Sequence, residues 1–185
     1  MQKKKTILKI AILGLSLAIS TIFSFIEAYY FIKFPGTGTL ELHLIPLFVI
    51  NYLFNEYYGI LLATILLTFN FFFIPSNIVS AWSFLLDYVL PTYGVVIWFF
   101  FYNLFFKIKL QTISLKSFFN YFWLILVIFL FKWGCNTASG HLFFQVSWLK
   151  SLLLNSTYNA VTFIFFLLIY KKVRIIVNNY HEKYY

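Results

Sequence analysis

Long apolar stretches separated by short polar breaks dominate the sequence. A bilayer core about 30 Å thick is crossed by a helix of roughly 20 apolar residues, and several stretches reach this length. The breaks contain residues that favour turns, such as Pro-Gly-Thr-Gly at 35–38 and Pro-Ser-Asn at 75–77. The pattern predicts six helices, the second and third being short for a full span. They are residues 7–29, 44–54, 59–74, 79–106, 118–145 and 148–170.

The composition agrees with a membrane location. Of 185 residues, 62% are hydrophobic, 24% are aromatic and only 10% are charged. A soluble domain of this size needs far more polar surface. We therefore expect an all-α integral membrane protein, with residues 1–185 forming one six-helix domain. The single cysteine, Cys135, excludes a disulfide framework, and the three histidines are too scattered for a metal site, so no metal or cofactor is expected.

The net charge of +9 reports topology. Cytoplasmic loops of membrane proteins carry an excess of Lys and Arg. An even number of spans places both termini and the fourth connection on one side, which then holds most of the cations. We expect this side to be cytoplasmic, with residues 1–6 and 171–185 as cytosolic tails and no nucleic acid partner. It carries Lys3, Lys4, Lys5, Lys9, Lys107, Lys109, Lys116, Lys171, Lys172, Arg174 and Lys183, against Lys33 and Lys150 opposite.

Several polar side chains lie inside the predicted spans, where a charge costs roughly 2.5–3.5 kcal/mol at mid-helix. Residues four apart share a helix face, so Lys132 and Asn136 lie on one face of the fifth helix. Asn155 and Asn159 likewise share a face of the sixth, while Asp87 lies in the fourth. Three helices therefore each present polar groups that must face inward.

Each of these groups has a structural and a functional interpretation. Asp87 pairs with Lys132 to fix helix register, or it is a carboxylate in a ligand cavity. Asn155 and Asn159 form interhelical hydrogen bonds, or they contact a ligand. Loop roles are the simpler expectation for His43 and Glu41. Aromatic residues that could stack on a flat ligand are Trp82, Tyr88, Trp133 and Tyr158.

Catalysis is not supported by the sequence. It contains no phosphate-binding loop, no H-E-x-x-H and no G-x-S-x-G motif. We expect no catalytic residues, and six helices without an energy-coupling motif indicate a binding subunit or a small channel.

Four segments together resemble a known family. Residues 34–46, with Gly36 and Gly38 before the second helix, are similar to the glycine-containing loop of the substrate-binding S components of energy-coupling factor vitamin transporters. The thiamin-specific members are most similar. Residues 83–88 resemble their helix-four segment ending in Asp/Glu-Tyr, and residues 136–140 and 151–158 resemble their helix-five and helix-six motifs. Asn136 replaces the usual histidine, and Glu41 replaces a glycine.

The resemblance implies a vitamin site, a lid and a docking face. The site residues would be Asp87, Tyr88, Asn136, Asn155 and Tyr158. The lid would include Thr37 and Gly38. Gly14 and Ala18, four apart on the first helix, would approach a partner helix closely, unless they pack within this chain.

The same resemblance implies a multi-pass protein of a bacterial cell membrane that imports a vitamin, with thiamin favoured. Its partners would be a transmembrane coupling subunit and two ATPase subunits, which would hydrolyse the ATP. Two alternatives remain open: an S component for another vitamin or heteroaromatic solute, and a small non-transport membrane protein such as a channel or an assembly factor.

Overall fold

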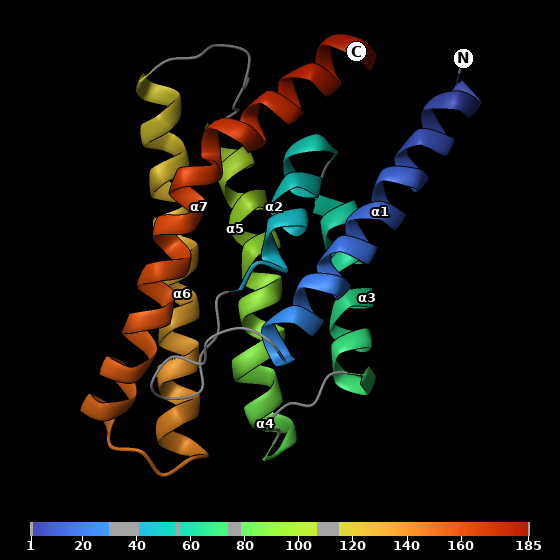
Figure 1. Cartoon of the computed structure of the whole chain (residues 1–185). Helices are drawn as coiled ribbons and strands as arrows, with labels where there is room; N and C mark the ends of the chain where they lie inside the picture. Colours follow the sequence, from blue (N-terminus) through green and yellow to red (C-terminus); the bar gives the residue numbers. More distant parts are fainter. Residues whose placement is uncertain (1, 30–40, 55, 74–78, 107–114, 185) are drawn as a thin grey trace.

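The computed structural model describes residues 2–29, 41–54, 56–73, 79–106 and 115–184, and all regular structure within them is helical (Figure 1). The predicted all-α fold is confirmed. The elements are α1 (Gln2–Tyr29), α2 (Leu44–Leu53), α3 (Glu56–Phe73), α4 (Ala81–Phe84), the π-helical turn η1 (Leu85–Val89), α5 (Leu90–Phe106), α6 (Leu115–Leu142) and α7 (Trp148–Tyr184).

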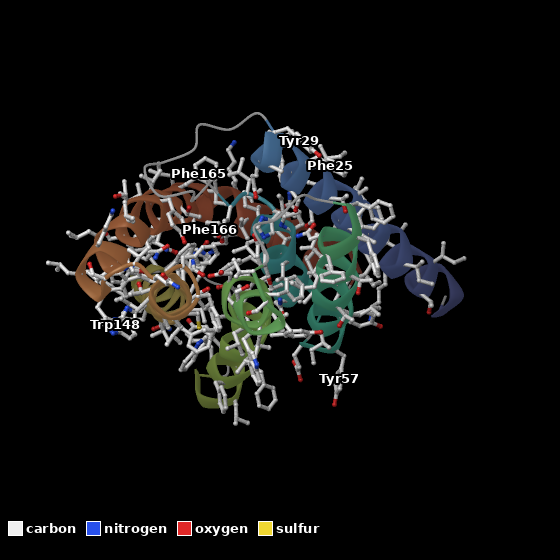
Figure 2. All side chains as sticks on the ribbon, turned by 90° about the horizontal axis from the view of Figure 1, so that it is seen from below. Phe25, Tyr29, Tyr57, Trp148, Phe165 and Phe166 are labelled. Carbon is white, nitrogen blue, oxygen red and sulfur yellow. The ribbon has the colours of Figure 1, made fainter. Side chains whose placement is uncertain are left out.

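Five of the described helical segments are long and apolar enough to cross a membrane: Thr6–Tyr29, Glu56–Phe73, Ala81–Leu104, Phe118–Leu142 and Trp148–Ile169. Their outer surfaces carry large apolar side chains. Tyr57 and Trp148 lie at the edge of the bundle in Figure 2, and their exposed fractions are 73% and 53%. Such aromatic residues at the rim of a bundle are typical of the membrane–water interface.

Helix α2 occupies the centre of the bundle. Its ten residues rise about 15 Å, too little to cross the bilayer alone, and it packs against α1, α3, α5 and α7. A helix that is apolar all round is stable only when surrounded by other helices, and Leu44, Leu47 and Ile50 are almost completely buried. The short second segment predicted from the sequence therefore exists, but as a core helix rather than a full span.

Both termini lie at the same end of the bundle in Figure 1. Helix α1 runs away from this end, and α2 starts near the middle of the bundle and points back toward it. This arrangement is the one that an even number of segments requires. The cytoplasmic location of the termini stays a prediction.

The fourth predicted helix contains a local irregularity. Ser80 begins it. The Ser80 hydroxyl accepts a hydrogen bond from the backbone N–H of Ser83, and the Ser83 hydroxyl accepts one from the backbone N–H of Ser80, so the two residues form a capping box. Pro91 has no N–H to bond to the carbonyl of Asp87 and its ring would collide with that carbonyl in a regular helix. The chain instead widens into η1, where the N–H of Leu90 bonds to the carbonyl of Leu85. Single π-helical turns of this kind are frequent at functional sites.

Helix α7 is longer than expected. Residues assigned to a cytosolic tail continue the helix to Tyr184. Val173, beyond the apolar span, packs with Leu53 near the end of α2, and Leu8 and Ile12 of α1 pack against this pair. The tail therefore begins as an ordered extension of the bundle.

Helices α2 and α3 approach each other at Gly59. A Cβ atom added to Gly59 would collide with the side chain of Asn51, which is 3% exposed and donates a hydrogen bond to the carbonyl of Leu47 at 2.8 Å. Glycine is therefore required for this close contact.

We predict that Gly59→Ala lowers the free energy of unfolding by about 1–3 kcal/mol, because the Asn51 amide must move within a packed interior. Gly134→Ala is the matched control, since an added Cβ there meets nothing within 4 Å. Thermal unfolding in detergent should show a clear loss only for Gly59→Ala. Equal unfolding temperatures for the two variants would contradict the close contact.

Candidate functional site

The ammonium group of Lys132 on α6 is the most deeply buried charge of the bundle interior. Lys132 is 1% exposed. Its Nζ lies 2.8 Å from Oε1 of Glu41 and donates a hydrogen bond of 2.9 Å to Oδ1 of Asn159 on α7. It also lies over the ring of Tyr158, 4.9 Å from the centroid. A buried charge is tolerated when it is paired and hydrogen-bonded, and these three contacts meet that condition.

A chain of hydrogen bonds that all run in one direction passes through the hydroxyl of Tyr158, the residue whose ring lies next to the Lys132 ammonium. Nδ2 of Asn136 donates to the hydroxyl of Tyr158 at 2.6 Å, and this hydroxyl donates to Oδ1 of Asn155 at 2.9 Å. Nδ2 of Asn155 in turn donates to the carbonyl of Ser151 at 2.9 Å. Oδ1 of Asn136 is buried and has no hydrogen-bond partner among the described residues. The residue that begins the chain therefore keeps a buried acceptor, which a ligand that donates hydrogen bonds would satisfy.

Asp87 enters the same region from η1. Its Oδ2 accepts a hydrogen bond of 2.6 Å from the hydroxyl of Ser139, which is completely buried on α6. Lys132, the alternative partner considered from the sequence, pairs with Glu41 instead. The carboxylate of Asp87 is thus held by a neutral hydroxyl and keeps acceptor capacity for another group.

The close packing of α6 and α7 brings these residues together. These two helices make the most extensive contact in the bundle and run side by side in Figure 1. Gly140 permits this, because a Cβ there would collide with the hydroxyl of Ser151. The polar groups lie toward the end of the bundle opposite both termini, since α6 ends and α7 begins there.

The predicted site residues do not all join this group, which we call the polar cluster: Glu41, Asp87, Lys132, Asn136, Ser139, Asn155, Tyr158 and Asn159. Asp87, Asn136, Asn155 and Tyr158 belong to it. Tyr88 stacks on Phe84, with ring centroids 5.5 Å apart. Thr37 and Gly38, the predicted lid residues, lie outside the described residues.

The formal charge of the polar cluster is negative. Glu41 and Asp87 contribute two carboxylates and Lys132 one ammonium, which gives a net charge of −1. The ammonium is neutralised by Glu41, so it does not repel a cationic ligand as an unpaired lysine would. The cluster is therefore complementary to a monocation that also donates hydrogen bonds.

The expectation of loop roles for Glu41 and His43 is wrong. Glu41 is the partner of Lys132, and His43 contacts Glu27 of α1 through Nδ1 at 2.6 Å. A signal for Glu41 was present in the sequence: a buried lysine needs a carboxylate, and the chain has only five Asp and Glu residues. Nothing in the local sequence shows which of the five it is.

The environment of His43 favours its charged form. Burial alone would lower the pKa of His43, but the Glu27 carboxylate, through its charge and its hydrogen bond, raises this pKa above its ordinary value. Glu41 adds to this effect and Lys132 opposes it. The contact between His43 and Glu27 therefore holds the start of α2 to α1, and it is an ion pair whenever His43 is protonated.

The two candidate docking residues lie on the outside of α1. Gly14 and Ala18 are both exposed, and an added Cβ at Gly14 meets nothing within 4 Å. Among the described residues, Gly14 does not pack against another helix of this chain, which was the alternative considered from the sequence.

A separate apolar cavity of about 380 Å³ lies between α3 and the helix formed by α4, η1 and α5. Thr64, Phe71, Phe84 and Tyr93 are among its lining residues, and none of the polar cluster contributes to it. The hydroxyls of Thr64 and Tyr93 are hydrogen-bonded to each other at 2.7 Å. The cavity is therefore apolar and distinct from the candidate site.

Comparison with known proteins identifies the family. The model of the family described as "Thiamine transporter protein (Thia_YuaJ)" matches residues 10–183. The chain belongs to this family. The prediction of a thiamin-specific transporter is thereby confirmed, and with it a multi-pass membrane protein of a transport family rather than an enzyme family.

A solved structure supports the fold of this thiamine transporter family member. The structure of ThiT from Listeria monocytogenes matches with a TM-score of 0.61 at 15% sequence identity, covering 97% of this chain and 96% of that chain. At this identity the match establishes a shared fold. No curated protein sequence matches the chain.

We predict that the unfolding temperature of the purified protein falls as the pH rises through the folded-state pKa of His43. This pKa is raised, so the stabilisation is complete below the unfolded-state pKa, about 6.5, and is lost above the folded one. His43→Asn should remove this dependence. His141→Asn should retain it, because His141 contacts the carbonyl of Val146 and the ring of Trp148, neither of which is charged. A pH dependence unchanged in His43→Asn would exclude the ion pair as its source.

Proposed function

We propose that the polar cluster is the thiamin site of an S component, which binds the vitamin from outside and delivers it to the cytosol. The observation that carries the proposal is the convergence of Asp87, Asn136, Asn155 and Tyr158 from η1, α6 and α7 on one buried region of net charge −1. Thiamin combines an aminopyrimidine, which donates hydrogen bonds, with a permanently cationic thiazolium ring. Both features match what this region offers.

Asp87 is the residue for the aminopyrimidine. A carboxylate accepts hydrogen bonds from an amino group and a neighbouring ring N–H more strongly than a neutral acceptor does. The unpaired Oδ1 of Asn136 supplies a second acceptor nearby. The ring of Tyr158, which already lies under the ammonium of Lys132, offers an aromatic face to a cation.

The proposed direction of transport follows from charge and position together. With both termini cytoplasmic, as the distribution of Lys and Arg favours, the polar cluster lies toward the outer side. Thr37 and Gly38 would then close over it as a lid. Import requires energy that this chain does not generate, since its sequence has no phosphate-binding loop. The energy would come from a coupling subunit and two ATPase subunits.

Helix α1 is the proposed docking element for the coupling subunit. Gly14 and Ala18 share its outer face, where an approaching helix meets no long side chain from these two positions. In lipid, helix association depends on close packing of this kind because there is no hydrophobic driving force between helices.

We predict that Asp87→Asn weakens thiamin binding roughly 30-fold or more, since removing one partner of a buried charge interaction costs about 2–5 kcal/mol. The asparagine retains an oxygen for the Ser139 hydroxyl, so the variant should insert and purify normally. Isothermal titration of the detergent-solubilised protein measures the change.

Ser139→Ala is the control, because it removes the hydrogen bond that the Ser139 hydroxyl donates to Asp87 and keeps the carboxylate. It should retain most of the affinity. Unchanged thiamin affinity in Asp87→Asn would remove Asp87 from the site. Stabilisation of the wild type by another B vitamin but not by thiamin would favour an S component of different specificity.

A second prediction concerns α1. Gly14→Leu or Ala18→Leu should reduce thiamin uptake by cells about tenfold or more while leaving thiamin affinity unchanged, because bulk at a close helix contact costs about 1–3 kcal/mol. Co-purification with the coupling subunit should fall in parallel. Leu15→Ala, on the exposed surface of the same helix, is the control. Normal co-purification of both leucine variants would contradict docking through this face.

A further inference from the structure

Helix α1 has a second, inward face that the proposed docking role does not use. Four polar residues at spacings of four, four and three follow this face, and all are at most 8% exposed. They therefore point toward the bundle, whereas Gly14 and Ala18 are exposed. The inward residues are Ser16, Ser20, Ser24 and Glu27.

Two of these residues hold a single residue of another segment, His43. Oε1 of Glu27 accepts a hydrogen bond of 2.8 Å from the backbone N–H of His43, and Oε2 lies 2.6 Å from its Nδ1. The hydroxyl of Ser20 donates to the carbonyl of His43 at 3.0 Å. The backbone donor, the backbone acceptor and the ring of His43 are thus all bound by α1.

His43 lies two residues after Glu41, at the turn that begins α2. The N–H of Leu44 bonds to the carbonyl of Glu41 at 3.4 Å, and the N–H of Ile45 bonds to that of Leu42 at 3.0 Å. The backbone of Glu41 is therefore tied to the same turn that α1 holds through His43. The Glu41 side chain, in contrast, reaches Lys132 of the polar cluster.

We propose that His43 is a positioning residue for ligand binding: held by Glu27 and Ser20, it fixes the turn from which Glu41 neutralises Lys132. The proposal rests on the proposed function, since it takes the polar cluster as the thiamin site. His43 acts through Glu41 and does not touch the ligand.

The physical reason is that Lys132 depends on one carboxylate. Lys132 is 1% exposed, so water cannot replace Glu41 if the turn moves. An ammonium without its carboxylate would change the cluster from net −1 to neutral and would oppose a cationic ligand. The placement of Glu41 therefore controls the charge that the polar cluster presents to a ligand.

A double-mutant cycle tests this route. His43→Ala should weaken thiamin binding about tenfold in the wild type, which is about 1.4 kcal/mol of binding free energy, because it removes the contact of the ring with the Glu27 carboxylate. Glu41→Gln should weaken binding to a similar extent. In the Glu41→Gln background, His43→Ala should then change thiamin affinity less than about twofold, because non-additivity is expected of residues that act through one contact. Isothermal titration of full-length protein measures each affinity.

The conservative variant separates positioning from simple loss of stability. His43→Asn places an amide donor near the position of Nδ1 and should recover most of the affinity. Tyr121 lies on α6 near the end that is far from the polar cluster, and its hydroxyl donates a buried hydrogen bond to the carbonyl of Phe166 on α7. Tyr121→Phe removes this bond and should lower the unfolding temperature without changing thiamin affinity. If His43→Ala does not fold, Glu27→Gln enters the same cycle, because it removes the charge that faces the ring.

Two results would overturn the proposal: unchanged thiamin affinity in His43→Ala, or the same tenfold loss in the wild type and in Glu41→Gln. Failure of the proposed function has a different signature. The wild type would then not bind thiamin, or Asp87→Asn would bind it normally, whatever the His43 variants do.

Discussion

The burial of one ammonium group constrains much of this structure. Lys132 lies where water cannot reach it, and a charge in that position is stable only with a carboxylate and further hydrogen-bond acceptors around it. Glu41, Asn159 and the ring of Tyr158 provide these contacts. They come from two different parts of the chain, so satisfying Lys132 also brings the start of α2 against α6 and α7.

The polar cluster shows how a membrane protein can keep hydrogen-bonding groups inside without losing stability. Its amides and hydroxyls are ordered in one direction, from Asn136 through Tyr158 and Asn155 to Ser151. At Asn136, where the order begins, the side-chain oxygen has no hydrogen-bond partner among the described residues. In a low-dielectric interior an unpaired polar atom is costly, and binding a donor there would recover that cost. The same arrangement that stabilises α6 against α7 thus forms the proposed thiamin site.

Helices α1 and α2 connect this site with the rest of the molecule in different ways. Helix α2 is short, apolar and central, and it organises the core. Helix α1 is peripheral, with small exposed residues outward and a polar face inward that ends in the contact between Glu27 and His43. One helix therefore carries both the proposed docking surface and the anchor of the turn that bears Glu41.

Much of this protein follows from its sequence alone. Hydrophobic length predicted where the helical segments lie, because the thickness of the bilayer fixes how many apolar residues a helix needs, but it did not predict that α7 continues to Tyr184. Spacings of four residues predicted that Asn136 and Asn155 face inward, the charge of Asp87 inside an apolar segment predicted the same for that residue, and four motifs together resembled the family. Only the tertiary structure decided three features. Lys132 pairs with Glu41 rather than Asp87, α2 is a core helix rather than a full span, and His43 is held by α1. Local sequence is silent on these contacts because they join residues that are distant along the chain, and only the packing of whole helices determines which of several carboxylates reaches a buried charge.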